Sequence, residues 1–477
     1  MANSWKIVIA QPHWRELEAH LFPGDDDEHA AVLRCGLARS KRGYRLLVHD
    51  VVIARDGVDY VPGTRGYRRL LPEFVSDVAE SCADEQLIYI GVHCHGGDNE
   101  VEFSNTDIAS HERGYPALLD ITAAPAVGAL VFAERAVAGD IWLADGNRVE
   151  ISELLVVGRP QIHLTPQPIR SRAAARGYDR QVRLFGDRGQ DILSRQKVAI
   201  IGLGGAGSLV SEYLARLGVG TLLLVDPDRV ETTNLPRLVG ARRFDAMAWL
   251  TNEDRPVLIQ RLGHALARYK VDVAARVARQ ASPDIHIDTL ADDVIEPNVA
   301  AALTDCDFVF LCADSHSARR LTDVLTHQYL IPSAEVGAKI NLDEDSGDVT
   351  DVFSVSRVSS PGGGCLRCNF LVSPRLLQEE GKSDGERRRG RYLDDEDVSS
   401  PSVIALNAVA ASQAVDDYLM AVTGLVDPSV DLDRWVGFHP ATDELEEFTL
   451  RKDPTCTSCG PTRFARGDAV RLPVRLK

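Results

Sequence analysis

The sequence predicts an α/β protein of two domains, in which the second domain is built on a doubly wound, largely parallel sheet. Two observations predict this class. From Tyr178 onwards, short apolar runs alternate with helical apolar patterns, as parallel strands joined by helices require. Between the first two runs lies a glycine-rich turn, Gly202 to Gly207, which is typical of βαβ units. The length of 477 residues is ample for two cores.

Composition and net charge exclude two classes of binding partner for this protein. Hydrophobic residues make up 44% and charged residues 26%, as in ordinary globular proteins. The net charge of −17 argues against nucleic-acid binding and against anionic membranes. No apolar run approaches a membrane-spanning length, and the N-terminal stretch lacks the features of a signal peptide. We therefore expect a cytoplasmic protein with no nucleic-acid or membrane partner.

The first domain is expected over residues 1–157 and reads as a smaller α/β unit. Its strand-like runs are Lys6–Ala10, Tyr44–Val52, Gln86–Val92 and Val127–Ala133. Acidic residues 25–28 precede residues 31–33, where we expect a helix. Residues 158–177, rich in proline and arginine, are predicted to form a linker.

The second domain is expected over residues 178–477. Its predicted strands are Val198–Ile201, Thr221–Asp226, His286–Leu290, Phe308–Leu311 and Pro332–Ala334. Residues 241–268 are expected to be mostly helical. The charged segment 378–400 is predicted to be a mobile loop that crosses the surface, and an apolar helix pattern starts at Val403.

The glycine-rich turn indicates a nucleotide site. It contains Gly202, Gly204, Gly205 and Gly207, and the strand that follows its helix ends at Asp226. Glycines let backbone N–H groups and a helix N-terminus approach phosphate, and an acid after the second strand can hold ribose hydroxyls. On its own this pattern fits any dinucleotide enzyme, and a dehydrogenase would be the default interpretation.

Further motifs favour another class. They are the YDRQ motif with Arg180, the NLPR motif with Asn234 and Arg237, then Lys270, Asp314 after a strand, and two CxxC pairs. In this order they resemble the ThiF/MoeB adenylyltransferase family, bacterial relatives of ubiquitin-activating enzymes with a Rossmann-like core. The resemblance covers roughly Tyr178 to Gly460.

The resemblance implies ATP-dependent adenylation of the C-terminal carboxylate of a ubiquitin-like protein or peptide, with a tail of small residues. It assigns the ribose to Asp226, the phosphates to Asn234, Arg237 and Lys270 beside the four glycines, and Mg²⁺ to Asp314. Arg180 would reach a phosphate from the partner subunit, which implies a homodimer. Fixed cations and one hard oxygen ligand suit this chemistry.

The two CxxC pairs, Cys365/Cys368 and Cys456/Cys459, predict a structural zinc site with four sulfur ligands; free buried thiols are the alternative. Thioester-forming relatives carry a cysteine in the crossing loop, and none lies between residues 370 and 453. The protein would then only adenylate, or pass the adenylate directly to an amine. A cysteine elsewhere, such as Cys312 or Cys306, is the third option.

The first domain carries a second constellation, HCHGGDNEVEFSNTD over residues 93–107. His93 and His95 point the same way from a strand, and Asp107 follows at fourteen residues from the first histidine. Together they can form a three-ligand zinc site with an open position. With Ser104, the pattern resembles the HxH…SxxD motif of JAMM (JAB/MPN) metallopeptidases, although the residues around the second histidine differ from the family's.

This second resemblance implies zinc ligation by the two histidines and Asp107, with Ser104 assisting the oxyanion. Glu28 is assigned as general base, with Asp27 and Glu16 as nearby alternatives. Zinc would acidify a bound water, and the base would pass its proton to the leaving amine. The alternatives are that the histidines are ordinary strand residues, or that the site is a non-catalytic scaffold.

The two resemblances together predict a fusion. The first domain would process or deconjugate a ubiquitin-like protein, and the second would adenylate its exposed C-terminus with ATP, Mg²⁺ and Zn²⁺; a conjugating enzyme is a further partner that this scheme allows. Two alternatives stay open. One is a peptide-modifying adenylyltransferase with a recognition domain, and the other is a scaffold without turnover.

Overall fold

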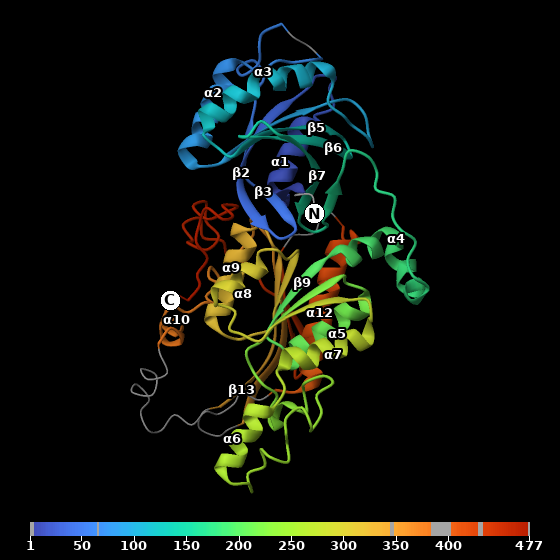
Figure 1. Ribbon diagram of the computed structural model, residues 1–477, viewed down its shortest axis with the longest axis vertical. Coiled ribbons are helices and arrows are strands. Elements are labelled where there is room, and N and C mark those ends of the chain that lie inside the picture. The colour runs from blue at the N-terminus through green and yellow to red at the C-terminus, as the bar shows by residue number, and fades with distance from the viewer. Residues whose placement is uncertain (1–3, 64–65, 344–347, 383–401, 428–432, 476–477) are drawn as a thin grey trace. The chain divides into compact units, whose positions relative to one another are not determined.

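Two eight-stranded sheets organise the chain, one in each of two units. The computed structural model describes residues 4–63, 66–343, 348–382, 402–427 and 433–475 (Figure 1). Unit 1 comprises Met1–Ser171, His327–Leu330 and Pro461–Arg471, and unit 2 comprises Arg172–Thr326, Ile331–Gly460 and Leu472–Lys477. Each unit is described separately below.

In unit 1 the sheet closes on itself. Its strands are β1 (Trp5–Ala10), β2 (Ala30–Ser40), β3 (Gly43–Ile53), β4 (Ile88–Cys94), β5 (Ala126–Ala133), β6 (Ala136–Leu143), β7 (Arg148–Val157) and β8 (Ile162–Leu164). The order is β1-β3-β2-β4-β5-β6-β7-β8, and β1 also pairs with β7. Three pairs are parallel, β1–β3, β1–β7 and β4–β5.

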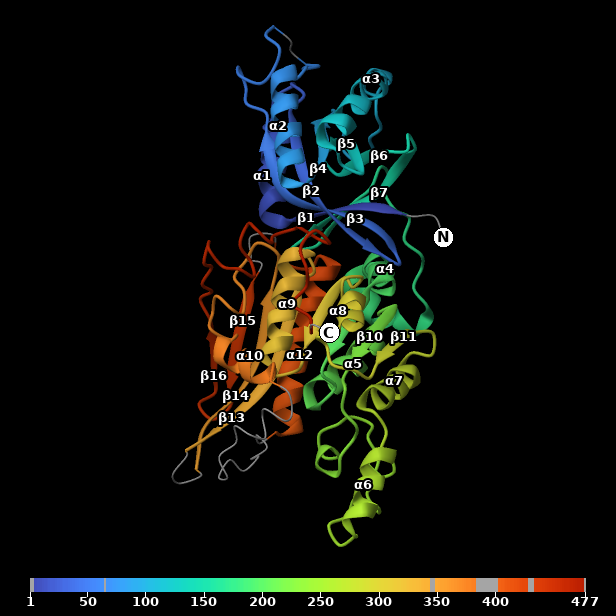
Figure 2. The same cartoon turned by 60° about the vertical axis from the view of Figure 1, so that its left-hand side comes forward.

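Helices cover the two faces of this sheet. They are α1 (Gln11–Leu21), α2 (Pro72–Glu85) and α3 (Asn105–Thr122). Trp14, Leu17 and Leu21 of α1 join one apolar cluster with alternate residues of the strands. The other face carries α2 and α3, which contact each other (Figures 1 and 2). Alternation along the strands divides the apolar residues between the two faces.

The helix predicted at residues 31–33 is wrong, because these residues lie inside β2. Val32 pairs with Val52 of β3 and with Gly91 of β4. Its side chain enters one cluster, whereas Ala31 and Leu33 enter the other. A strand buried on both faces gives a continuous apolar run, and periodicity alone cannot separate such a run from a buried helix. The predicted linker also contains β8, which pairs with β7.

Residues 461–471, here called the tail segment, lie along the edge of the second half of β2. Strand β4 pairs with β2 only as far as Cys35. Beyond it, Gly467 forms a parallel bridge with Leu37, and the backbone of Asp468 donates to the Leu37 carbonyl at 2.8 Å. The Asp468 carboxylate accepts from the backbone N–H of Arg39 at 2.8 Å. The tail segment is therefore an internal part of unit 1.

Unit 2 is a mixed sheet with helices on both faces. Its strands are β9 (Lys197–Ile201), β10 (Thr221–Val225), β11 (His286–Leu290), β12 (Phe308–Leu311), β13 (Ser333–Leu342), β14 (Val349–Ser359), β15 (Arg434–His439) and β16 (Glu444–Glu447). Strands β9 to β13 run parallel to one another and lie in the order β11-β10-β9-β12-β13. Strands β14, β15 and β16 follow β13 in the sheet, each antiparallel to the strand before it. The five predicted strands are confirmed, while the antiparallel edge makes the sheet less parallel than expected.

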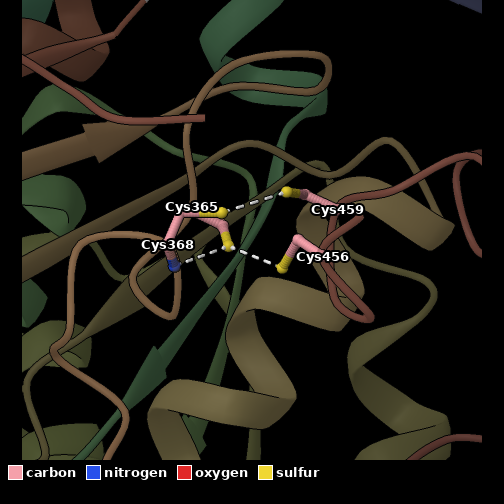
Figure 3. A group of neighbouring side chains, drawn as sticks. All are labelled: Cys365, Cys368, Cys456 and Cys459. Atoms are coloured by element: carbon pink, nitrogen blue, oxygen red, sulfur yellow. Dashed lines mark hydrogen bonds between the residues drawn. The ribbon is translucent and has the colours of Figure 1, made fainter. Parts of the chain in front are cut away.

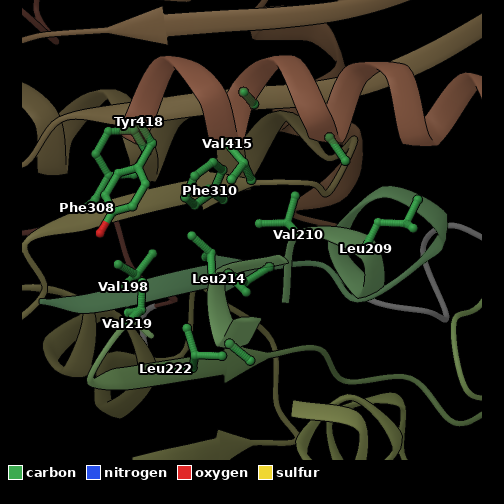
Figure 4. Packing of buried hydrophobic residues seen from close by; sticks show 14 of the residues in the cluster. Val198, Leu209, Val210, Leu214, Val219, Leu222, Phe308, Phe310, Val415 and Tyr418 are labelled. Carbon is green, nitrogen blue, oxygen red and sulfur yellow. The ribbon is translucent and has the colours of Figure 1, made fainter. Parts of the chain in front are cut away.

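The helices of unit 2 follow the same alternation. They are α4 (Asp179–Arg195), α5 (Gly205–Leu217), α6 (Val257–Leu266), α7 (Lys270–Ala281), α8 (Pro297–Leu303), α9 (His316–Gln328), α10 (Pro374–Glu380) and α12 (Ile404–Thr423), with short 3₁₀ turns η1 (Arg176–Tyr178) and η2 (Thr232–Asn234). Helices α4, α5, α7 and α12 cover one face, where Phe308 and Phe310 of β12 meet Tyr418 of α12 (Figure 4). Helices α8 and α9 lie on the other face (Figure 1).

Three further sequence predictions concern unit 2. The apolar helix after Val403 is confirmed as α12. Residues 241–268 are less helical than expected, since turns precede α6. The predicted mobile loop begins in α10, and most of it, residues 383–400, lies outside the described residues. No helix in the described part of the chain is long and apolar enough to cross a membrane.

The tail segment generates a stability prediction. Gly467 has φ +51°, and a Cβ there would lie 2.3 Å from the Leu37 carbonyl oxygen. Gly57 also has a positive φ, but an added Cβ would meet nothing within 4 Å. Gly57→Ala should cost only backbone strain, about 1–2 kcal/mol. Gly467→Ala should add the clash and lower the unfolding free energy by about 2–5 kcal/mol in total, measured by chemical denaturation. Equal losses for the two variants would contradict the role of the tail segment.

Candidate functional site

The glycine loop, residues 202–207, joins β9 to α5 at the carboxyl end of the parallel strands and includes the first three residues of α5. Gly202 has φ +87°, and a Cβ there would be 2.8 Å from the backbone N of Ala313. A Cβ on Gly207 would lie 1.9 Å from the Gly202 carbonyl oxygen. An added Cβ on Gly204 would meet nothing within 4 Å. Glycine is thus required at positions 202 and 207, where the backbone is closely approached by other atoms. At Gly204 the loop is open and can be approached by a ligand.

Asp226 fastens this loop to the end of β10. Its carboxylate accepts from the backbone of Leu203 at 2.6 Å and of Asp228 at 2.8 Å. Burial raises the pKa of Asp226, and the nearby charge of Lys270 opposes this. The Lys270 Nζ lies 3.8 Å from Asp226 and 2.6 Å from the exposed Asp228 carboxylate. Asp228 is a site neighbour that the sequence motifs did not single out.

Asn234 and Arg237 lie on the segment that follows. The Asn234 side chain is buried and accepts from the backbone N–H of Glu231 at 3.1 Å, which closes η2. The Arg237 Cδ atom is 3.6 Å from the position that a Gly205 Cβ would take. Among the described residues, the Arg237 side chain has neither a hydrogen-bond nor an ion-pair partner, while its backbone N–H donates to the Asn234 carbonyl at 3.0 Å. An unpaired guanidinium beside an open glycine loop is suited to phosphate.

Asn407 of α12 completes this side of the glycine loop. Its Nδ2 would be 2.1 Å from a Gly205 Cβ, and it donates to Ser402 Oγ at 3.1 Å. It is 5% exposed. Asn407 comes about two hundred residues after the loop in the chain, so no local motif could have revealed the contact.

Asp314 comes three residues after β12, which flanks β9 on the side away from β10. The two strand ends are joined because Cys312 donates its backbone N–H to the Ile201 carbonyl at 2.7 Å. Asp314 is exposed and has no partner in the described part of the chain. Arg180, in the first turn of α4, is likewise exposed and unpaired there. The structure thus brings the Asp314 backbone beside the loop, whereas Arg180 is not placed at this site by any contact.

The thiol of Cys312 is poorly suited to nucleophilic attack. Burial raises its pKa far above the usual range, and the charge of Glu335 adds to this effect. Cys306 is also fully buried. Because the thiolate is the reactive form of cysteine, neither residue supports the alternative of a thioester formed on a cysteine outside the crossing loop.

The four cysteines of the two CxxC pairs meet in one buried cluster of unit 2 (Figure 3). The Sγ atoms of Cys365 and Cys456 are 3.7 Å apart, and those of Cys368 and Cys459 are 3.6 Å apart. Tetrahedral zinc with Zn–S bonds of about 2.3 Å places its sulfurs about 3.8 Å apart. The spacing therefore fits a structural zinc ion.

Backbone groups support this four-cysteine cluster. The N–H groups of Cys368, Asp453 and Ser458 each donate to a cluster sulfur at 3.4 Å. The buried Asp323 carboxylate of α9 accepts from the N–H groups of Leu366 and Arg367 at 2.9 and 3.0 Å. The N–H groups bonded to sulfur offset negative charge there, and the bonds to Asp323 hold the first CxxC turn in place.

In unit 1, His93, His95 and Asp107 form a second group of metal-type ligands, called here the histidine–aspartate cluster. The two Nε2 atoms are 3.1 Å apart and lie 3.5 and 3.4 Å from the Asp107 oxygens. Zinc with bonds of 2.0–2.1 Å places neighbouring ligand atoms about 3.3 Å apart when tetrahedral. The donor set and its spacing therefore fit a zinc ion.

Asp107 is placed by the start of α3. Ser104 is the N-cap, its Oγ donates to Asp107 Oδ2 at 2.7 Å, and its backbone N–H donates to the same oxygen at 2.8 Å. Burial raises the pKa of Asp107, but hydrogen bonds from His93, His95 and Ser104 outweigh it and hold that pKa far below the usual range. The carboxylate is therefore charged and held in place by both its cap and the histidines.

Glu28 is the acid that lies nearest to this cluster among the three considered from the sequence. Its Oε1 is 4.0 Å from His95 Nε2, and burial raises its pKa while His93 and His95 oppose this. The Asp27 carboxylate instead accepts from the backbone N–H of Gly66 at 2.8 Å. Glu16 is exposed on α1. The geometry favours Glu28, and its catalytic role stays a prediction.

The sequence motifs did not single out Cys94 and His29, which support the cluster from behind. Cys94 lies between the two histidines on β4, and its Sγ accepts from the backbone N–H of His29 at 3.2 Å. Because strand residues alternate in direction, Cys94 points away from the ligands. It joins β4 to the segment that carries Glu28.

A glycine loop after β9, with acids after β10 and β12, the two parallel strands that flank β9, is typical of a nucleotide-binding α/β protein. The ThiF family model matches residues 178–458. This match spans more than half of the chain, and the chain belongs to the ThiF family. The model covers none of residues 1–177, so the metallopeptidase resemblance of that part stays a prediction.

Relatives match a similar share of the chain. The molybdopterin-synthase adenylyltransferase of Escherichia coli (strain K12) is 26% identical over 285 residues, 59% of this chain and 95% of that protein. The SAMP-activating enzyme E1 of Haloferax volcanii is 27% identical over 278 residues, 58% of this chain and 84% of that protein. The solved structure of E. coli MccB with succinimide is 20% identical with a TM-score of 0.43, and covers 60% of this chain and 75% of that chain.

The two ligand clusters generate a prediction of metal content. The wild type should bind about two zinc ions per chain, whereas His95→Ala and Cys456→Ser should each bind about one, because each loses a ligand. Elemental analysis of the purified protein measures this. His286→Ala, which alters an exposed histidine outside both clusters, should keep both ions. An unchanged zinc content in either ligand variant would exclude zinc from that cluster.

Proposed function

We propose that unit 2 catalyses ATP-dependent adenylation of the C-terminal carboxylate of a ubiquitin-like protein or peptide. One observation carries this proposal. In a chain of the ThiF family, Arg237 Cδ lies near Gly205 and the backbone of Ala313, the residue before Asp314, lies near Gly202, in a glycine loop whose Gly204 side is open. The side chains of Arg237 and Asp314 have no partner among the described residues. The curated relatives named adenylyltransferase and activating enzyme support it.

In the proposed reaction, a carboxylate oxygen of the substrate attacks the α-phosphorus of ATP. The bond from that phosphorus to the bridging oxygen breaks, and pyrophosphate leaves. The glycine loop and Asn234 bind phosphate oxygens, while Arg237 and Lys270 offset the charge that develops on them. Asp226 faces the ribose, and Asp314 would hold Mg²⁺, which supplies additional positive charge at the phosphates when bound.

Arg180 is proposed to act in a homodimer. It is exposed in the first turn of α4 and unpaired among the described residues, so it is available to a phosphate held by a partner subunit. Its guanidinium would add a third fixed cation to Arg237 and Lys270. After adenylation we expect direct transfer to a nucleophile of another molecule, since residues 370–453 contain no cysteine and the Cys312 thiol is held protonated by burial.

Asp314→Ala tests the adenylation. With a carboxylate substrate present, the rate of ATP–pyrophosphate exchange should fall about 100-fold or more in the variant, because Mg²⁺ at the phosphates would lose its carboxylate ligand. Exchange of radiolabelled pyrophosphate into ATP measures this. Asp348→Ala, which alters another exposed acid of unit 2, is the control and should retain exchange. Full exchange in Asp314→Ala would refute the assignment, and exchange absent from the wild type with every substrate would favour a scaffold.

For unit 1 we propose zinc-dependent removal of a C-terminal extension or conjugate from the same ubiquitin-like protein, as the JAMM resemblance implies. The observation in favour is the spacing of the histidine–aspartate cluster, with Glu28 4.0 Å from His95. When bound, zinc would polarise the scissile carbonyl and acidify a water. Glu28 would take the proton from that water and deliver it to the leaving amine. Ser104 Oγ would release its bond to Asp107 Oδ2 and donate to the developing oxyanion.

The two proposed activities are chemically consecutive. Cleavage of an amide at the end of a ubiquitin-like protein leaves a free C-terminal carboxylate, and adenylation needs that group. A first domain that only recognises substrate remains the competing proposal. It predicts binding of the ubiquitin-like protein without cleavage.

Glu28→Gln separates these proposals. Cleavage of a tail-extended ubiquitin-like protein should fall by about 10²–10⁴-fold through loss of the general base, while zinc stays bound because the three ligands are intact. Glu16→Gln, in the exposed acid of α1, is the matched control and should cleave normally. Gel analysis of the cleaved tail, with zinc analysis of each variant, measures both. Equal cleavage by Glu28→Gln and the wild type would remove Glu28 from the mechanism.

A further inference from the structure

The last residue of α10 makes a contact that the proposed mechanism does not use. The two carboxylate oxygens of Glu380 accept from the backbone N–H groups of His316 and Ser317, each at 2.8 Å. These are the first two residues of α9. At the other end of α10, the backbone N–H of Ser373 donates to His316 Nδ1 at 3.1 Å. Both ends of α10 are thus fastened to the start of α9.

The start of α9 in turn fixes the backbone on one side of Asp314. Ser315 accepts from the backbone N–H groups of Ala318 through its Oγ at 3.3 Å and of Arg319 through its carbonyl at 3.1 Å. On the other side, Cys312 is bonded to Ile201 at the end of β9. The Asp314 side chain itself has no partner among the described residues. Its position is therefore determined by these two backbone attachments.

The amides that Glu380 binds would otherwise lack protein partners, because the first N–H groups of a helix have none within the helix. Glu380 is half-buried. Burial raises its pKa, but hydrogen bonds from Ser317 and His316 outweigh this and lower the pKa below its usual range. A charged carboxylate is a strong acceptor for such amides. The contact is thus well formed at neutral pH.

We propose that Glu380 is a positioning residue for Asp314, which holds the first turn of α9 so that the Asp314 carboxylate faces the metal and phosphates of bound nucleotide. This inference rests on the proposed adenylation. The role is local, because α9 is otherwise held by its own buried side chains, including Leu321 and Leu325. Loss of Glu380 should therefore loosen the Asp314 turn without unfolding the helix.

The neighbouring residue provides a matched control. Glu379 is on the same helix, is exposed, and only approaches Arg375 at 3.9 Å. It shares the charge, the helix and the side-chain type of Glu380. A change seen in Glu380→Ala and absent in Glu379→Ala therefore reports the contact with α9 and excludes a general effect of removing a negative charge.

The test is the affinity of the full-length protein for ATP, measured by calorimetry once with Mg²⁺ and once with EDTA. In Glu380→Ala the gain in affinity that Mg²⁺ provides should fall about tenfold, since small displacements of a ligand are costly, and affinity in EDTA should stay within about twofold. Glu380→Gln, whose amide oxygen can accept one bond, should be intermediate. Both Glu379 variants, to Ala and to Gln, should match the wild type.

A double variant tests whether Glu380 acts through Asp314. Asp314→Ala should abolish the Mg²⁺-dependent gain, and adding Glu380→Ala should cause no further loss, because the two act through one route. Thermal unfolding of each variant checks that the fold is kept. An unchanged gain in Glu380→Ala, or an equal loss in Mg²⁺ and EDTA, would overturn the inference. If the wild type bound no ATP in either condition, the proposed adenylation would itself be refuted.

Discussion

The carboxylate of Asp226 holds together the segments on which the nucleotide side of unit 2 depends. Asp226 is only 4% exposed. Burying an ionised carboxylate costs several kcal/mol unless hydrogen bonds and a nearby positive charge replace the lost water. The amides of Leu203 and Asp228 and the ammonium of Lys270 supply that replacement. The glycine loop is thereby fixed to β10 in one conformation, and a loop that is already ordered needs little reorganisation when phosphate binds.

The two ligand clusters contrast in construction. The four-cysteine cluster joins two turns 91 residues apart in the chain, and all four residues are buried, which suits an ion that only stabilises the fold. The histidine–aspartate cluster is carried by the end of a strand and the first turn of a helix, and its histidine side chains are 19% and 20% exposed. Access to solvent together with three ligands is the arrangement that leaves room for a water or a substrate.

Local pattern was sufficient for the glycine loop, the five parallel strands and the membership of both clusters, because each depends on residues close in sequence or on fixed ligand spacing. It failed at β2, where burial on both faces removes the alternation that identifies a strand. It could not indicate Glu380, whose hydrogen-bond donors are 64 and 63 residues away, or Asn407 beside Gly205. Such contacts exist only after the sheet has brought separate segments together.

The tail segment also has a consequence for the order in which the chain acquires its structure during translation. Domains generally fold as they leave the ribosome, the N-terminal one first. Here Leu37 and Arg39 of β2 are made early, but their partners Gly467 and Asp468 are made after nearly all of unit 2. While residues 172–460 are being made, the second half of β2 can pair with β3 along one edge but has no partner along the other edge. Unit 1 is therefore completed only after residues 172–460 have been made.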